Sequence, residues 1–243
     1  MAYADFARVY DRLMADTDYP RRAAFFHTLA GRFRAPGKLL LDLCCGTGSI
    51  SHLLLERGYE VIGVDRSPEM LSVAAEKYGG RVLLLCQDCR ALDLYGTVDI
   101  TVSALDSLNH LPDRASLCQA FERVSLFTAP GGLFLFDMNT PYKHQQVLGR
   151  HTFVTETEDL YCVWQNWLEG PDHRVEIRLD FFERRPGGAY ARSGEQFAEI
   201  AFSPEEVERM LRSQGMTLLA LYDAETEGEP QPDSERLLYV ARK

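Results

Sequence analysis

Residues 39–48 constrain the fold of this chain more than any other segment. They read LLLDLCCGTG, an apolar run that ends in small residues and glycines, and apolar residues at helical spacing follow as far as Gly58. This pattern predicts a buried strand that turns directly into a helix. Gly46 and Gly48 let the backbone pass close to a bound molecule, and the N–H groups at the start of the helix favour an anion such as a carboxylate. The turn is therefore predicted to be a ligand site.

Asp65 is the next landmark, because it ends a second apolar strand over residues 60–64. An acidic side chain about twenty residues after the glycines can bind both hydroxyls of a ribose. This much fits a nicotinamide dinucleotide equally well. The dinucleotide fingerprint, however, needs a third glycine three residues after Gly48, and Ser51 stands there. A dehydrogenase is therefore disfavoured.

Four segments resemble, in chain order, the successive motifs of the class I S-adenosylmethionine-dependent methyltransferases. They are residues 42–48, 64–70, 86–88 and 105–109. The opening, residues 10–19, is similar to that of a bacterial small-molecule subgroup close to the amino-sugar N-methyltransferases. The resemblance implies a Rossmann-like α/β fold with a mostly parallel seven-stranded sheet, and S-adenosyl-L-methionine as the cofactor. Cys44 departs from the family pattern, which usually has Gly or Ala there, and narrows the space beside the methionine end of the cofactor.

The resemblance also implies cofactor contacts. Asp65 would bind the ribose, and Asp88 would accept a hydrogen bond from the adenine amino group, with capping of the following turn as its alternative role. Arg66 would lie against the adenine or carry a solvated charge. Tyr10 and Tyr19 would lie near the methionine group, or simply pack their rings. The full set of cofactor-binding candidates is Tyr10, Tyr19, Asp42, Cys44, Gly46, Gly48, Asp65, Arg66, Met70, Gln87, Asp88, Cys89 and Leu105.

The transferable methyl group is predicted to lie where a fourth strand, residues 98–103, ends beside the glycine turn. Methyl transfer from a sulfonium is an in-line displacement, so the protein mainly aligns donor and acceptor in a dry pocket. If an amine acceptor needs deprotonation, His110 could act as the base and Asp106 could hold or orient the ammonium form. Tyr10 is the third catalytic candidate, and a purely structural role is the alternative for His110.

The rest of the pattern predicts one domain over residues 1–243. Residues 151–202 alternate apolar and polar side chains, which predicts an antiparallel sheet inserted after the fifth strand. This insertion could cover the active site or pair two subunits of a homodimer. Trp164 and Trp167 are expected on opposite faces of one strand, so at most one faces the pocket.

Smaller features of the second half of the chain are also predicted. Residues 129–132 are expected to end the helix that precedes the fifth strand, and Asn139 and Tyr142 are candidate substrate contacts beyond it. The last two strands should form the hairpin that closes the family's sheet. The charges of the loop between them, residues 223–235, are expected to be solvated.

Composition excludes some partners. Lys and Arg number 26 against 36 Asp and Glu, a net charge of −10, which argues against DNA or large RNA. The pair Arg21 and Arg22 could still form a basic spot or a solvated face. No run of about eighteen apolar residues could span a bilayer, and the first residues lack a signal-peptide pattern. A cytoplasmic protein is predicted.

The cysteines suggest a metal only weakly. Cys44, Cys45, Cys86 and Cys89 form a Cys-Cys pair and a Cys-x-x-Cys pair, but no second Cys-x-x-Cys or paired histidine follows. We interpret them as reduced, buried thiols and predict no metal.

These patterns predict a methyltransferase that acts on a nitrogen or oxygen of a small metabolite. Two alternatives remain open at this point. A tRNA-base methyltransferase would share the cofactor fold but would need a basic rim. A non-catalytic regulatory module would bind S-adenosylmethionine and use the insertion as a partner interface.

Overall fold

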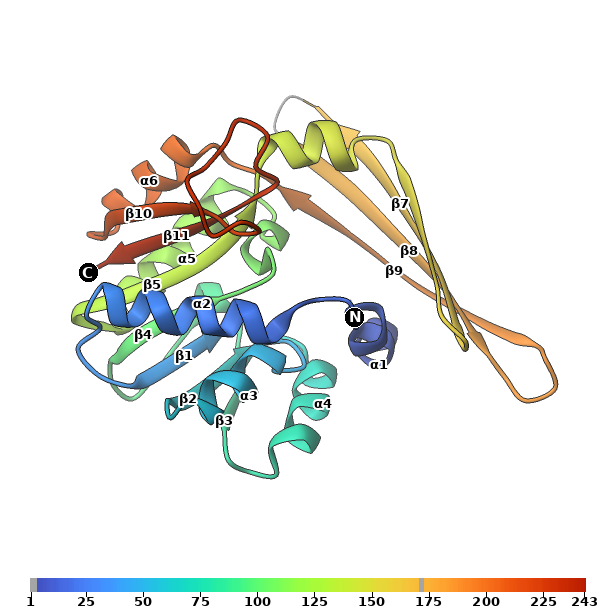
Figure 1. Ribbon diagram of the computed structural model, residues 1–243, viewed down its shortest axis with the longest axis horizontal. Coiled ribbons are helices and arrows are strands. Elements are labelled where there is room, and N and C mark those ends of the chain that lie inside the picture. Colours follow the sequence, from blue (N-terminus) through green and yellow to red (C-terminus); the bar gives the residue numbers. More distant parts are fainter. Residues whose placement is uncertain (1–3, 171–172) are drawn as a thin grey trace.

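The computed structural model describes residues 4–170 and 173–243, which form two sheets (Figure 1). The larger sheet has seven strands in the order β10-β11-β5-β4-β1-β2-β3. Their bounds are β1 Leu39–Leu43, β2 Glu60–Asp65, β3 Leu83–Cys86, β4 Val98–Ser103, β5 Thr128–Asn139, β10 Thr217–Asp223 and β11 Arg236–Arg242. The first five strands pair in parallel, whereas β11 pairs antiparallel with both β5 and β10. The predicted closing hairpin, with the last strand beside the fifth, is confirmed.

Helices cover both faces of this sheet. They are α2 Tyr19–Arg32, α3 Ser49–Glu56, α4 Pro68–Tyr78, α5 Arg114–Phe127 and α6 Pro204–Ser213, with short helical turns η1 Cys89–Ala91, η2 Ser107–His110 and η3 Lys143–Leu148. Alternate strand residues face opposite layers: Leu133 and Leu135 pack with α2 and α3, and Phe134 and Phe136 pack with α5 and α6. Within the described residues, no helix is long and apolar enough to cross a membrane.

Helix starts follow the capping residues that the sequence contains. The Ser67 hydroxyl accepts the N–H of Met70 at the start of α4, with Pro68 in the first turn. Ser203 and Glu206 form a reciprocal capping box at the start of α6. These caps satisfy backbone donors that would otherwise be unpaired, and they set where each helix leaves its strand.

The second sheet is antiparallel and lies between β5 and α6 in the chain. Its strands, paired in chain order, are β6 Thr152–Glu156, β7 Leu160–Glu169, β8 Arg174–Arg184 and β9 Tyr190–Ile200. The sheet extends away from the main body, and α1, Ala4–Leu13, lies against it (Figure 1). Val9 of α1 packs with Leu160, Cys162 and Phe181 in a small core of their own.

The two tryptophans of β7 lie three positions apart, so their side chains point to opposite faces of the sheet, as predicted. Trp164 packs its ring edge against Phe153 of the neighbouring strand. Both indoles are substantially exposed, and neither lines the pocket described below.

Two expectations about the second half of the chain are wrong. Residues 129–132 do not precede the strand but lie within β5 as an irregular stretch, because the pairing with β4 begins at Thr128 and shifts before Leu133. The shift leaves more residues on β5 than on β4, and Gly131, with φ of +78°, allows β5 to bulge there.

The charges of the loop at residues 223–235 are not simply solvated. Glu225 pairs with Arg22 at 2.8 Å, and Glu227 pairs with Arg21 at 2.9 Å. The loop folds over α2, so its carboxylates neutralise both arginines. Arg21 and Arg22 therefore do not form an unpaired basic patch.

Candidate functional site

A pocket lies at the carboxyl ends of the parallel strands, where open α/β sheets usually bind ligands. It encloses about 1030 Å³ of empty space, part of which opens to solvent. Every predicted cofactor-binding residue except Gly48 lies in its wall. The sequence analysis did not single out Thr47, Ser49, Ala104 and Ser107, which also line it. They are small residues in the loops and turns that follow β1 and β4, and this position is the signal that would have found them.

The glycine turn adopts the strained backbone that its sequence predicts. Gly46 has φ of +54° and Gly48 has φ of +76°, and Cys44 shares this left-handed region with φ of 61°. A Cβ on Gly46 would meet no atom within 4 Å, whereas one on Gly48 would collide with the ring of Tyr78. Gly48 therefore allows close packing between α3 and α4, and its contact with the cofactor stays a prediction.

Asp42 ends β1 behind the turn and is almost fully buried. The Ser51 hydroxyl donates to its Oδ2 at 2.5 Å. Burial raises the pKa of Asp42 to about 7, against the opposing effect of this hydrogen bond. Ser51 occupies the position of the third glycine in the dinucleotide pattern. Its hydroxyl hydrogen-bonds to the carboxyl group of Asp42 below the glycine turn.

Asp65 joins the end of β2 to the glycine turn. Its Oδ2 accepts the N–H of Gly46 at 2.9 Å, and its Oδ1 accepts the N–H of Ser67 at 2.8 Å. Burial raises the pKa of Asp65, while these backbone donors oppose the rise. Each carboxylate oxygen retains a second lone pair for a ligand hydroxyl.

Asp88 caps η1, as its alternative role predicted. The carboxylate accepts from the backbone N–H of Arg90 at 2.9 Å and from the guanidinium of the same residue at 2.5 Å and 2.9 Å. These hydrogen bonds hold the pKa of Asp88 below its usual range. Asp88 still lines the pocket, so its contact with adenine stays a prediction.

The pocket is also lined by weakly acidic groups whose pKa values are raised. Burial raises the pKa of both Tyr10 and Tyr19, which come from the two N-terminal helices. A hydrogen bond with Cys89, together with burial, raises the pKa of the Cys44 thiol well above its ordinary value. The expectation that these four strand-end cysteines are buried holds fully only for Cys89. Cys44 and Cys45 are half-buried, and Cys86 is exposed because β3 is an edge strand.

His110 and Asp106 do not share the pocket. His110, at the end of η2, lies in its wall, whereas Asp106 lies outside it and binds Arg236 at 2.5 Å. Burial alone would raise the pKa of Asp106, but Arg236 and Lys143 lower it below its usual value. The carboxylate already has a buried cation as its partner, so it is poorly placed to hold an acceptor ammonium. This corrects the role expected for Asp106.

The turn that carries Asp106 is held by a second buried acid. Leu105 and Asp106 both adopt left-handed conformations, with φ of 57° and 53°. Their backbone N–H groups donate to Asp137 at 3.0 Å and 2.7 Å. Strained backbone conformations persist only where surrounding contacts stabilise them. Here the carboxylate of Asp137 on β5 stabilises the turn by accepting both N–H groups.

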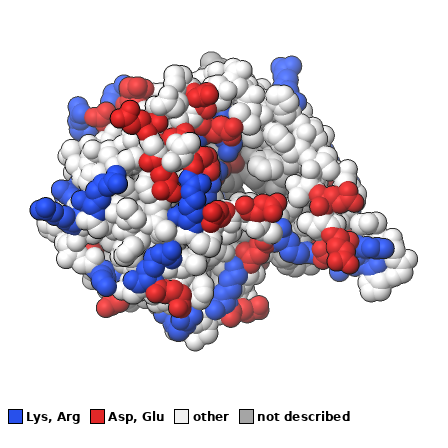
Figure 2. Space-filling view, in the orientation of Figure 1, with Lys and Arg blue, Asp and Glu red and all other residues white. Residues whose placement is uncertain are grey.

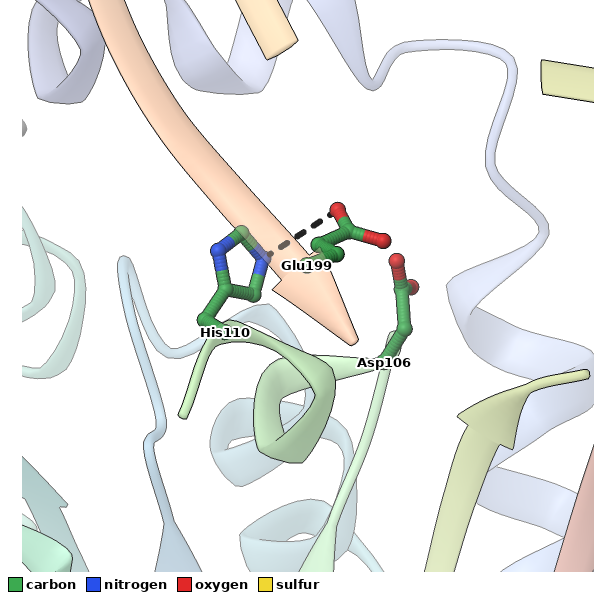
Figure 3. Close-up of side chains that lie close together, drawn as sticks. All are labelled: Asp106, His110 and Glu199. Carbon is green, nitrogen blue, oxygen red and sulfur yellow. Dashed lines mark ion pairs between the residues drawn. The ribbon is translucent and has the colours of Figure 1, made fainter. Parts of the chain in front are cut away.

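A group of polar residues that sequence reasoning missed lies beside His110. Glu199 at the end of β9 is buried, and its carboxylate points between His110 and Asp106 (Figure 3). Asn139, a candidate substrate contact, instead donates to both Asp106 and Glu199, at 2.8 Å and 3.0 Å. Tyr142, the other candidate, is exposed and does not line the pocket. No local pattern marks Glu199, because only the folded insertion brings it here.

Comparisons with known proteins agree with this geometry. Residues 40–132 match a family described as "Methyltransferase domain". YqeM of Bacillus subtilis, a protein named as a methyltransferase, is 35% identical over 100% of this chain and 98% of its own length.

Solved structures extend the likeness to the whole fold. An S-adenosylmethionine-dependent methyltransferase from Clostridium acetobutylicum is 32% identical, with a TM-score of 0.89 over 99% of this chain and 98% of its own. CalS10 of Micromonospora echinaspora, an amino pentose methyltransferase solved with S-adenosylmethionine bound, has a TM-score of 0.76 over 96% of both chains at 22% identity.

Proposed function

Because this chain belongs to the S-adenosylmethionine-dependent methyltransferases, we propose that it methylates a nitrogen or oxygen atom of a small metabolite. The observation that carries the proposal is the continuous pocket, which joins Asp65 and the glycine turn at one end to His110 at the other. A concave site that combines apolar walls with a few polar groups is the usual form of a small-molecule pocket. At 22% identity, the similarity to CalS10 supports only the fold. The inference about the acceptor therefore rests on the pocket.

The residues in the wall fit the cofactor. Gly46 leaves open space where a side chain would otherwise project, which allows a ligand to approach the backbone. Asp65 would bind the ribose hydroxyls and Asp88 the adenine amino group, while Tyr10 and Tyr19 would enclose the methionine end. When bound, the cofactor would supply an electrophilic methyl carbon, and Ala104 and Leu105 belong to the wall that would enclose it.

This chain's own contribution to the chemistry is alignment and proton transfer. Orientation of donor and acceptor in a closed site can lower a barrier by roughly 7–11 kcal/mol. Both tyrosines stay neutral, so no tyrosinate competes with the acceptor for the methyl group. His110 lies in the wall where it would take the proton that the acceptor gives up.

The charge distribution favours a small acceptor over tRNA. Figure 2 shows Lys and Arg interspersed with Asp and Glu on the face in view, instead of a continuous basic rim. With a net charge of −10, the protein should not retain bulk tRNA in a filter-binding titration at physiological salt. Specific retention would favour the tRNA-base alternative.

Isothermal calorimetry with S-adenosylhomocysteine tests the pocket directly. The wild-type protein should bind, and Asp65→Ala should weaken binding by more than tenfold, because a hydrogen bond to a charged group contributes about 1.5–3 kcal/mol. Asp93→Ala is the matched control, since that carboxylate is exposed and lies outside the pocket. Equal affinities for wild type and Asp65→Ala would place the cofactor elsewhere.

The acceptor class is tested with labelled cofactor. Incubation with methyl-labelled S-adenosylmethionine and a metabolite extract should label a low-molecular-mass product. Label found only in a nucleic-acid or protein fraction would contradict a small acceptor.

A further inference from the structure

The inserted sheet contacts the ring of His110 with two side chains of one strand. The ring centre of Phe197 lies 4.9 Å from that of His110, and Glu199 Oε1 lies 3.7 Å from His110 Nε2 (Figure 3). Phe197 and Glu199 are two residues apart on β9, so they project from the same face of the sheet. The inserted sheet thus contacts a residue of the pocket wall, His110.

Glu199 is a buried carboxylate, and its charge needs hydrogen-bond donors or a cation nearby. Only 4% of the residue is exposed, and a buried charge is costly unless it is paired and hydrogen-bonded. Asn139 Nδ2 donates to its Oε2 at 3.0 Å. His144 Nε2 lies 3.5 Å from the same oxygen.

His144 packs beside this carboxylate and hydrogen-bonds on its other side. His144 Nδ1 lies 2.6 Å from the carbonyl oxygen of His173, and a carbonyl only accepts, so Nδ1 carries a hydrogen. Among the described residues, Nε2 of His144 is buried without a hydrogen-bond partner. Asn139 Nδ2 is therefore the donor that the structure shows for Glu199 Oε2.

A metal ion would be the competing explanation for the cluster. Ligand atoms of Asp106, His110 and Glu199 all lie within 4.8 Å of one another. Asp106, however, is already bound by Arg236 at 2.5 Å and by Asn139 at 2.8 Å. A divalent cation would have to displace a buried guanidinium, so these donors do not fit a metal.

We propose that Glu199 is a positioning residue that holds His110 in one orientation and one tautomer, an inference that rests on the proposed methyl transfer. Its Oε2 accepts from Asn139, and its Oε1 accepts from Nε2–H of His110. The lone pair of His110 is then on Nδ1, directed away from Glu199 (Figure 3). The distance of 3.7 Å is longer than an ordinary hydrogen bond, and such contacts often shorten only once substrate is bound.

The reaction step is balanced in protons and electrons. The acceptor atom forms a bond to the methyl carbon, and the bond from that carbon to sulfur breaks with its electron pair left on sulfur. The proton of the acceptor moves to Nδ1 of His110. Glu199 touches none of the reacting atoms and acts through His110.

Nitrogen NMR of protein labelled with ¹⁵N-histidine tests the proposal without a known acceptor. With S-adenosylhomocysteine present, the neutral His110 ring should be protonated on Nε2 and unprotonated on Nδ1, with the resonances assigned by their loss in His110→Asn. Glu199→Gln keeps the size of the side chain but removes the charge. In this variant the two ring-nitrogen frequencies of His110 should move toward each other as both tautomers become populated.

Glu195→Gln is the matched control, because Glu195 projects from the same face of β9 four residues before Glu199 and does not line the pocket. Its His110 spectrum should equal that of the wild type. If Glu199→Gln fails to fold, Glu199→Asp tests the same contact by withdrawing the carboxylate one methylene. A His110 spectrum identical in wild type and the folded Glu199 variant would overturn the proposal. Absence of S-adenosylhomocysteine binding by the wild type would instead overturn the proposed function.

Discussion

Gly46 and Gly48 both adopt left-handed backbone conformations, but their surroundings differ. Gly46 borders open pocket space, whereas Gly48 contacts the ring of Tyr78, whose hydroxyl donates to the Gly48 carbonyl. The same pair of glycines in the sequence therefore has one member suited to ligand approach and one suited to helix packing.

Alanine substitutions should separate these two roles. Gly48→Ala should lower the free energy of unfolding by about 1–3 kcal/mol, because strain and a collision with Tyr78 add. Gly46→Ala carries a similar backbone strain without the collision, so it should be less destabilising while still weakening S-adenosylhomocysteine binding. Urea denaturation and calorimetry of the two variants check this. Equal losses of stability would show that the contact with Tyr78 is unimportant.

The buried Asp42 should make stability depend on pH. Its folded pKa of about 7 lies above the unfolded value near 3.9, so the ionised form is disfavoured in the folded protein. Wild-type stability should therefore fall as the pH rises from about 4 to about 7, relative to Asp42→Asn, and the difference should be constant above that range. Each unit of pKa shift corresponds to about 1.4 kcal/mol, so a difference of at least about 1 kcal/mol is expected. Urea denaturation of both proteins at several pH values measures it, and parallel curves would contradict the assignment.

At the scale of elements, α1 links the glycine turn to the inserted sheet. Asp11 accepts a hydrogen bond from Thr47 at 2.7 Å and pairs with Lys77 of α4 at 2.7 Å. The next residue, Arg12, pairs with Asp159 at 2.7 Å and Glu183 at 2.8 Å. Since Tyr10 of the same helix lines the pocket, these contacts hold one wall in place.

Arg12→Ala should loosen that wall with little effect on global stability. Its ion pairs are partly exposed, so the loss in unfolding free energy should stay below about 1 kcal/mol. Amide hydrogen exchange over residues 9–13 should become faster, and S-adenosylhomocysteine should slow it again. Arg212→Ala removes a comparable exposed pair on α6 and should leave exchange in α1 unchanged. Unchanged exchange in Arg12→Ala would show that other contacts hold α1.

For the whole molecule, ligand binding should appear as thermal stabilisation. S-adenosylhomocysteine at a hundred times its Kd should add about 2.7 kcal/mol, which raises the Tm of a protein of this size by about 5–10 °C. NAD at the same concentration should leave Tm unchanged, because Ser51 supports Asp42 where the dinucleotide pattern requires glycine. Differential scanning fluorimetry compares the two ligands. A larger shift with NAD would reverse the assignment of the cofactor.

The cofactor end of the pocket could be predicted from sequence because its determinants are local. A strand end, a glycine turn and the acid that ends the next strand lie within some twenty residues of one another, and residue periodicity and turn residues mark each of them. Asp65, Gly46 and Cys89 accordingly lie in the predicted wall. The two faces of the central sheet follow from the same short-range alternation.

Only the tertiary structure decided the acceptor end. Glu199 reaches His110 through the register of an inserted sheet, and Arg236 reaches Asp106 from the last strand, so each contact joins residues far apart in the chain. A buried charge needs a partner, but nothing in the local pattern says which distant residue supplies it. The sequence by itself therefore determined which strand ends meet at the glycine turn. Long-range pairing of buried charges determined the surroundings of His110 and Asp106.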